Sequence, residues 1–180
     1  MRELSLNILD IAQNSISAGA PLITIEVSEN TTDHTLFIGI YDNGKGMSEE
    51  QQKSVIDPFF TTRTTRKVGM GIPLFKMAAE QTGGSLEIKS ELGVGTEIKA
   101  NFKTDSVDFT PLGDVASTIQ MLITMNTDRN FVYKHTVDGK DFVCDTREIK
   151  AILGDVPLDS YEISQWILDF IKENTEVLYK

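Results

Sequence analysis

The residues with the clearest chemical potential lie in Asp42-Asn43-Gly44-Lys45-Gly46-Met47, directly after an alternating apolar run over residues 36–41. An acidic residue at the end of a strand, followed by two closely spaced glycines, favours a tight turn. Because glycine has no Cβ atom, the backbone of such a turn can approach a flat ligand. The same residues are also typical of a turn without a ligand, since Asp-Asn-Gly is common in turns. The stretch therefore indicates either a binding turn or a plain turn.

Asp10 and Asn14 place a carboxylate and an amide one helical turn apart, on the same face of an expected helix over residues 4–17. The apolar residues that recur at helical spacing are Leu4, Ile8, Ile11 and Ala12. Asn7 continues the polar stripe one turn earlier, and we expect it to be polar helix surface, with a position facing the same site as Asp10 and Asn14 as the alternative.

Two further glycine pairs follow along the chain. Gly69-Met70-Gly71 opens an expected helix that ends at Gly83-Gly84. Leu92-Gly93-Val94-Gly95 joins two alternating segments in the manner of a hairpin, so that Thr96 begins the second strand. Residues 59–67 are polar and basic without periodicity, which predicts a loop.

These residues require a set of helices and strands to position them. We expect strands over residues 23–27, 35–41, 85–90 and 96–102, and a capped helix over residues 48–56. Beyond residue 103 we expect a helix over 111–126, a hairpin of 131–133 and 142–144 around Asp138-Gly139, and helices over 146–153 and 159–175.

Length and composition exclude several classes of protein. The 180 residues suffice for one core, or for one core with a smaller appendage, and 40% apolar with 24% charged residues is typical of a globular protein. No apolar run approaches the roughly 20 residues of a membrane span, and the N-terminus lacks the plan of a signal peptide. The single cysteine excludes an internal disulfide and, with only two histidines, a zinc site. We therefore expect a cytoplasmic protein that does not contact a membrane.

The net charge of −10 argues against nonspecific nucleic-acid binding, which requires basic surface to displace counterions. Residues 1–103 carry 10 basic and 13 acidic side chains, whereas residues 104–180 carry 7 and 14. This asymmetry suggests two regions, a first domain over 1–103 and an acidic extension over 104–180, although a solvated acidic face explains it as well.

Taken in order, Asp10 and Asn14, Asp42-x-Gly44-x-Gly46, Gly69-x-Gly71 and Gly93-x-Gly95-Thr96 resemble the motifs of the GHKL ATPases. This family includes DNA gyrase, large heat-shock chaperones, histidine kinases and MutL proteins, and the resemblance covers roughly residues 4–102. Residues 10–20 look most like MutL, whereas Asp57-Pro-Phe-Phe-Thr-Thr-Arg63 looks like the corresponding box of histidine kinases.

The resemblance implies an α+β two-layer sandwich of the Bergerat type, in which helices cover one face of a mixed, mostly antiparallel sheet. A small α/β extension over residues 104–180 would follow this ATP-binding domain.

The resemblance also implies a site for ATP and Mg²⁺. Asn14 would coordinate the ion, Asp42 would accept a hydrogen bond from the adenine amino group, and Thr96 would support Asp42, often through water. Gly46 would let the backbone approach the base, and residues 61–68 would form a lid over the phosphates. The further residues expected to bind nucleotide are Gly44, Met47, Arg63, Lys67, Gly69, Met70, Gly71 and Ile72.

These residue types suit the implied roles. Mg²⁺ takes oxygen ligands and keeps several waters, so one amide oxygen from Asn14 is a reasonable contribution. The helix start at residues 69–72 would form an anion site for phosphate. Arg63, Arg66 and Lys67 place positive charge on the lid, where they would bind phosphate or serve solubility alone.

Asp10 stands where many relatives carry a glutamate as general base. Aspartate is one methylene shorter, so its carboxylate would reach the attacking group less well. Three roles stay open for Asp10: a general base, a water-mediated partner of the metal, or a helix-surface charge. Lys67 stands where many histidine kinases carry another lid glycine, so the lid departs from the family's pattern.

We expect a Mg·ATP-binding protein that acts as an ATPase or as a Ser/Thr protein kinase on a partner protein. The alternative is a nucleotide-gated interaction module with negligible catalysis. Histidine kinases carry their phosphoacceptor histidine on a hairpin before the ATP domain, whereas the first motif here begins within ten residues of Met1. We therefore expect no such domain of its own, and we expect His34 and His135 to be exposed to solvent.

The extension carries no catalytic motif that the family would supply. Lys134, Lys140 and Lys150 are formal candidates for the lysine with which gyrase and MutL proteins reach the γ-phosphate. Its apolar stripe consists of Trp166, Ile167, Phe170 and Ile171. We expect this stripe to pack internally, with a surface for a partner or a homodimer as the alternative.

Overall fold

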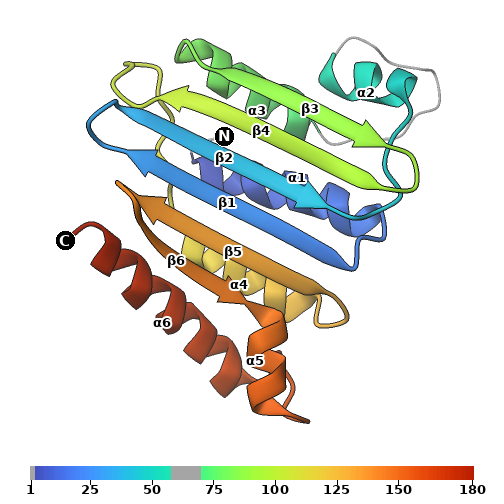
Figure 1. The fold of residues 1–180 in the computed structure, drawn as a ribbon, viewed down its shortest axis with the longest axis vertical. Coiled ribbons are helices and arrows are strands. Elements are labelled where there is room, and N and C mark those ends of the chain that lie inside the picture. The colour runs from blue at the N-terminus through green and yellow to red at the C-terminus, as the bar shows by residue number, and fades with distance from the viewer. Residues whose placement is uncertain (1–2, 58–69) are drawn as a thin grey trace.

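The computed structural model describes residues 3–57 and 70–180 (Figure 1). In chain order the elements are α1 (Leu4–Ser17), β1 (Leu22–Asn30), β2 (Thr35–Asp42), α2 (Glu49–Ile56), α3 (Gly71–Gln81), β3 (Ser85–Glu91), β4 (Gly95–Lys103), α4 (Val115–Met125), β5 (Asn130–Val137), β6 (Lys140–Asp145), α5 (Thr146–Leu153) and α6 (Tyr161–Leu178).

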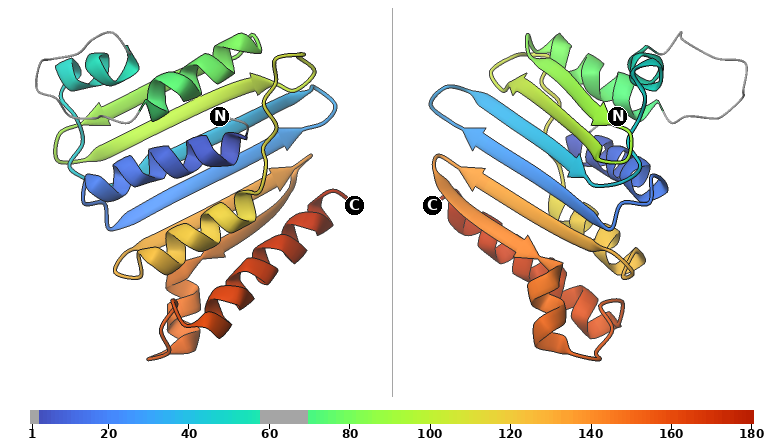
Figure 2. Two further views of the ribbon diagram at one scale, coloured as in Figure 1. Left: turned by 180° about the vertical axis from the view of Figure 1, so that it is seen from behind. Right: turned by 45° about the vertical axis from the view of Figure 1, so that its right-hand side comes forward.

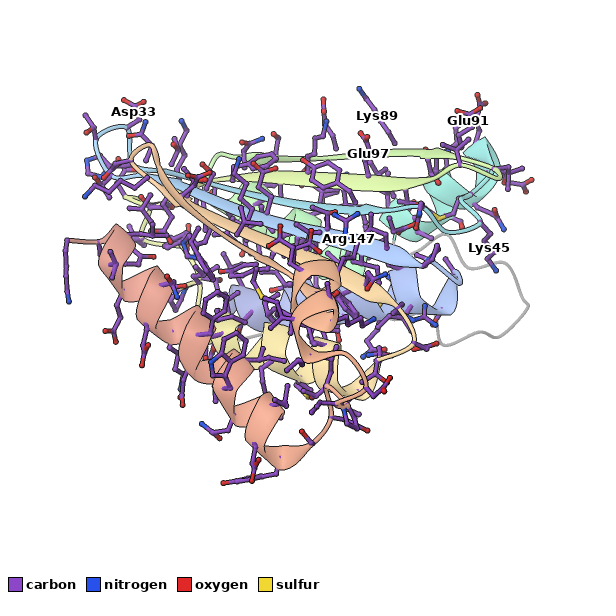
Figure 3. All side chains as sticks on the ribbon, turned by 60° about the horizontal axis from the view of Figure 1, so that its bottom comes forward. Asp33, Lys45, Lys89, Glu91, Glu97 and Arg147 are labelled. Atoms are coloured by element: carbon purple, nitrogen blue, oxygen red, sulfur yellow. The ribbon has the colours of Figure 1, made fainter. Side chains whose placement is uncertain are left out.

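The strands form one sheet in the order β3-β4-β2-β1-β5-β6. The β1–β5 pair is parallel and the other pairs are antiparallel. Helices α1, α3, α4 and α6 lie on the same side of the sheet (Figure 2). The charged side chains of Lys89, Glu91 and Glu97 project from the opposite, uncovered side (Figure 3). The expected two-layer α+β fold, with a mixed and mostly antiparallel sheet, is confirmed.

The alternation of side chains along the strands explains the two layers. In β1 the buried residues are Ile23, Ile25 and Val27, and polar residues stand between them. Because side chains on a strand point to opposite faces in turn, one apolar face must be covered. The apolar stripe of α1 covers it, since Leu4, Ile8, Ile11 and Ala12 are each at most 1% exposed.

Residues 104–180 continue the same sheet and the same core. Strand β5 pairs with β1 so that Asn130 lies opposite Leu22, and β6 then pairs with β5. A parallel pair requires a long crossover, which here contains α4. Buried residues from both parts of the chain belong to one hydrophobic cluster.

The expected apolar stripe of α6 is divided between core and surface. Ile167 and Ile171 are fully buried, which confirms internal packing for these two. Trp166 is 48% exposed and stacks on Phe170, with ring centroids 4.9 Å apart. Phe170 in turn meets Phe142 of β6 edge to face.

Helix α4 begins at Val115, not at residue 111 as the pattern predicts. Gly113 has φ +78°, which is outside the helical region, and Asp114 serves as the N-cap. Its carboxylate accepts the N–H of Ser117 at 3.0 Å, and the hydrogen bonds from Ser117 lower the pKa of Asp114.

His135 is buried, and the prediction that it is exposed is wrong. It follows Tyr133 on the inner face of β5 and is 1% exposed. Its Nδ1 lies 2.7 Å from the Tyr133 hydroxyl, and its Nε2 lies 3.3 Å from Oε1 of Glu29. The Tyr179 hydroxyl, at the end of α6, donates to the same Glu29 oxygen at 2.7 Å. His34, by contrast, is exposed as predicted, in the β1–β2 turn.

None of the helices within residues 3–57 and 70–180 combines the length and the apolar character that a membrane crossing requires.

The reactivity of the Cys144 thiol reports on how tightly β6 packs against the helices. Its side chain is 1% exposed, and burial raises the pKa of the thiol to about 12. Because the thiolate is the reactive form, we expect a disulfide reagent at pH 8 to modify the native protein very slowly. In guanidinium chloride the same reagent should label one thiol per chain within minutes. Labelling of the native protein at the denatured rate would contradict this packing.

Candidate functional site

A pocket of about 200 Å³ opens between α1, the end of β2 and the start of α3. It is lined by Ile11, Asn14, Ser15, Ser17, Ala18, Asp42, Lys45, Gly46, Met47, Val55, Ile72, Thr96 and Ile98. The structure thus brings together six residues that the sequence predicts: Asn14, Asp42, Gly46, Met47, Ile72 and Thr96.

The Asp42 carboxylate is held from two sides. The Ser15 hydroxyl of α1 donates to Oδ2 at 2.6 Å, and the backbone N–H of Gly44 donates to Oδ1 at 2.9 Å. An ionised carboxylate has about four acceptor positions, so these two bonds leave room for a donor from the pocket. The carboxylate is therefore oriented and still able to accept.

The turn after β2 is tied to its neighbours by the backbone. The N–H of Lys45 donates to the Ala18 carbonyl at 3.0 Å, and the Lys45 carbonyl accepts the N–H of Gly93 at 2.8 Å. Gly44 is packed tightly, because a Cβ atom there would lie 2.9 Å from both Cβ and O of Ala18. These contacts fix the position of the turn relative to α1 and to the hairpin between β3 and β4.

Gly46 is required by the fold as well as expected at the ligand. Its φ is +69°, and a Cβ atom there would lie 2.0 Å from the carbonyl oxygen of Glu91. The backbone of the hairpin between β3 and β4 therefore occupies the space that a side chain would need.

Thr96 has Ser90 as its direct hydroxyl partner among the described residues, at 2.8 Å. The Ser90 hydroxyl also donates to the Gly95 carbonyl at 3.0 Å and accepts the N–H of Met47 at 2.8 Å. Thr96 lies opposite Asp42 in the β2–β4 register, beside it but not hydrogen-bonded to it in this structure. Ser15 holds the Asp42 carboxylate directly, and support of Asp42 by Thr96 through water stays a prediction.

Asp10 lies against the start of α3. A Cβ atom on Gly71 would lie 3.0 Å from the Cβ of Asp10, so glycine is what allows the two helices to meet here. No side chain within the described residues caps this end of α3, and Pro73 in its first turn has no N–H. Met70 precedes the helix and is 52% exposed. Asn7, one turn before Asp10, is buried, so its prediction as helix surface is wrong.

Several predicted residues fall elsewhere. Arg63, Lys67 and Gly69, with the whole lid segment 61–68, lie outside the described residues, so their roles stay predictions. The three candidate lysines are absent from the pocket lining. Lys150 donates to the carbonyls of Thr127 and Arg129, Lys134 lies 3.9 Å from Asp141, and Lys140 begins β6.

The sequence analysis missed Ser15, Lys45 and Ser90. Ser15 continues the apolar stripe of α1 four residues after Ile11, and a small polar residue on a buried stripe is a signal for a specific partner. Lys45 stands between two glycines of the turn after β2 and lines the pocket, and its side chain points away from the ribbon (Figure 3). Ser90 had no distinguishing pattern, because the partners of its hydroxyl come from two other segments, the turn at Met47 and the start of β4.

The described residues contain no group of three or more His, Cys, Asp or Glu side chains that could hold a metal ion. The exposed amide of Asn14, at the pocket, fits the mode of Mg²⁺ binding in which one or two protein oxygens complete a shell of water and phosphate.

Comparison with known proteins gives two kinds of likeness. A sequence profile of histidine kinase-, DNA gyrase B- and HSP90-like ATPases matches residues 1–106. The sensor protein SrrB of Staphylococcus aureus is 38% identical over 101 residues, which are 53% of this chain and 17% of that protein. The chain therefore spans less than a fifth of the length of this relative.

Two solved structures resemble the fold. The Aquifex aeolicus MutL ATPase domain complexed with ADP matches with a TM-score of 0.52 at 14% identity, over 85% of this chain and 69% of that one. The N-terminal domain of a DNA repair protein matches with a TM-score of 0.56 at 13% identity, over 86% of this chain and 58% of that one. At these identities the likeness concerns the fold alone.

The steric role of Gly46 can be separated from its backbone conformation. Gly46 and Gly93 both have positive φ, +69° and +77°, but only a Cβ at position 46 meets other atoms. We expect Gly93→Ala to cost about 1 kcal/mol of unfolding free energy, from the left-handed conformation alone. Gly46→Ala should cost at least about 2 kcal/mol more, because the β3–β4 hairpin must move. Equal losses in denaturant unfolding would contradict the contact with Glu91.

Proposed function

Because the chain belongs to the family of histidine kinase-, DNA gyrase B- and HSP90-like ATPases, we propose that it binds ATP with Mg²⁺ in the pocket at Asp42. The observation that carries this proposal is the Asp42 carboxylate, oriented by Ser15 and Gly44 and still able to accept a donor. An adenine amino group is a donor of the required kind, whereas the carbonyl oxygen of guanine at the same position would place a second acceptor against the carboxylate.

The walls of the pocket support the placement of a base beside Asp42. Apolar side chains of Ile11, Met47, Val55, Ile72 and Ile98 surround it. A flat aromatic ring buries apolar area on both faces in such a site, while one carboxylate fixes its orientation. Gly44 and Gly46 lie in the turn after Asp42, and Gly46 borders the pocket with its backbone because it has no side chain.

The phosphates would lie toward Asn14 and the start of α3. Asn14 would supply an amide oxygen to Mg²⁺, which bound there would neutralise charge on the phosphate oxygens. The N–H groups of Gly71 and Ile72 belong to an uncapped helix start, and the helix dipole favours an anion at this end. Lys45 on the pocket rim adds a cation that the motif did not assign.

The chemistry that we propose is transfer of the γ-phosphoryl group to water or to a Ser/Thr hydroxyl of a partner protein. Asp10 of α1, which lies against the start of α3, would accept the proton of the attacking hydroxyl. The second candidate is a nucleotide-gated interaction module, and the shorter side chain of Asp10 is the observation that favours it. ATP turnover by the purified protein supports hydrolysis, whereas label that appears only on a second protein supports kinase action.

Asp42→Asn tests the binding proposal. The amide presents a donor as well as an acceptor and loses the charge, so we expect ATP affinity to fall at least about tenfold. Titration calorimetry with Mg·ATP measures it, and Mg·GTP should bind the wild type weakly. Asp105→Asn, which changes an exposed carboxylate outside the pocket, is the matched control. Full ATP affinity in Asp42→Asn, with the fold intact by circular dichroism, would refute the assigned site.

Asp10→Asn separates binding from catalysis. The variant keeps the size of the side chain but cannot accept a proton, so we expect ATP turnover or label transfer to fall at least about 100-fold. ATP affinity should stay within about threefold, since Asp10 is assigned to the proton and not to the base. Asp10→Glu, which restores a carboxylate, should retain measurable activity. Unchanged turnover in both variants would exclude Asp10 as the base.

A further inference from the structure

Helix α1 is held at both ends by residues of the C-terminal region. At its start, the N–H groups of Leu4 and Ser5 donate to the carbonyls of Pro111 and Leu112, each at 2.9 Å. At its end, Nη1 of Arg129 donates to the carbonyls of Ile16 and Ala20, each at 3.1 Å. The terminal turns of a helix leave backbone groups without partners inside the helix, and these contacts supply them.

The Arg129 contact suits a helix C-terminus. Its guanidinium places a positive charge where the helix dipole is negative, and its side chain is only 17% exposed. Next to it, the N–H of Asn130 donates to the Pro21 carbonyl at 2.8 Å. The β1–β5 register explains the location, since Asn130 lies opposite Leu22 and Arg129 therefore stands beside the α1–β1 connection.

The turn that Arg129 holds is the one that touches the pocket. Ser15 donates to Asp42 at 2.6 Å, and Ala18 accepts the N–H of Lys45 at 3.0 Å. Gly44 packs so tightly on Ala18 that a Cβ atom would not fit. A shift of this turn would therefore displace both the partner of Asp42 and the backbone of Lys45.

Arg129 itself is fixed by α5. The ammonium of Lys150 donates to the carbonyls of Thr127 and Arg129 at 3.1 and 3.0 Å, and to the Asn130 side chain at 3.0 Å. These three bonds hold the backbone of the α4–β5 connection on both sides of Arg129. A continuous set of contacts thus leads from α5 through Arg129 and α1 to the pocket.

We propose that Arg129 is a positioning residue for the pocket: by holding the last turn of α1, it keeps Ser15 and Ala18 against the turn of Asp42 and Lys45. This assigns to the C-terminal region a role in setting nucleotide affinity, although none of its residues lines the pocket. The affinity readout rests on the proposed function, whereas the positioning itself is a property of the ligand-free protein.

The test compares Arg129→Ala with Arg129→Lys and with Ile171→Val in the full chain. Ile171→Val removes a methyl group from a fully buried side chain of α6, so it lowers stability without touching α1. In ligand-free Arg129→Ala, amide hydrogen exchange at Lys45 should quicken about tenfold relative to the amide of Ile40 in β2. ADP affinity by calorimetry should weaken by about fivefold to tenfold. Arg129→Lys, which retains the charge, should recover part of both effects, and Ile171→Val should show neither.

Equal quickening of exchange at Lys45 and Ile40 in Arg129→Ala would make Arg129 a general stabiliser and overturn the proposal. Unchanged ADP affinity in that variant, with a wild type that binds ADP, would overturn it as well. A wild type that does not bind ADP would refute the proposed function alone, because the exchange measurement would still decide whether Arg129 positions the turn.

Discussion

The parallel pairing of β5 with β1 is the constraint on which the arrangement of this protein depends. It converts two halves of the chain into one sheet, and its register fixes where the second half meets the first. Because Asn130 lies opposite Leu22, the connection before β5 must reach the end of α1. The same register carries Tyr133 and His135 under the helical layer, where Tyr133 contacts His135 and His135 contacts Glu29 of β1. Without this pairing, the backbone edge of β1 that faces β5 would be exposed to solvent, and so would the ends of α1.

The local elements of the fold could be predicted from the sequence because each has its own signal. The helix of α1, the hairpin turn at Asp138-Gly139 and the capping box at Ser48 and Gln51 all depend on residues close together in the chain. The grouping of Asn14, Asp42 and Thr96 followed from the order of the family motifs. The start of α4 was misjudged because Pro111 is acceptable in a first helical turn, whereas Gly113 adopts a conformation outside the helix.

The remainder depends on contacts between distant segments, which no local pattern encodes. Ser90 bonds to Met47, Gly95 and Thr96, and only the folded hairpin brings these together. His135 was predicted to be exposed, although its alternation with Phe131 and Tyr133 marks the inner face of β5. The likeness to the MutL domain covers 85% of the chain, more than residues 1–106 make up, so part of the C-terminal region recurs in that fold.

The stacking of Trp166 on Phe170 gives the protein a built-in optical reporter. Trp166 is the only tryptophan of the chain, and it lies on α6, whereas the pocket is formed by α1, β2, β4 and the segments around α2 and α3. A ligand in the pocket has no direct contact with this indole ring. Any change in tryptophan emission on addition of a nucleotide would therefore record a rearrangement carried across the sheet, and its rate would be the rate of that rearrangement.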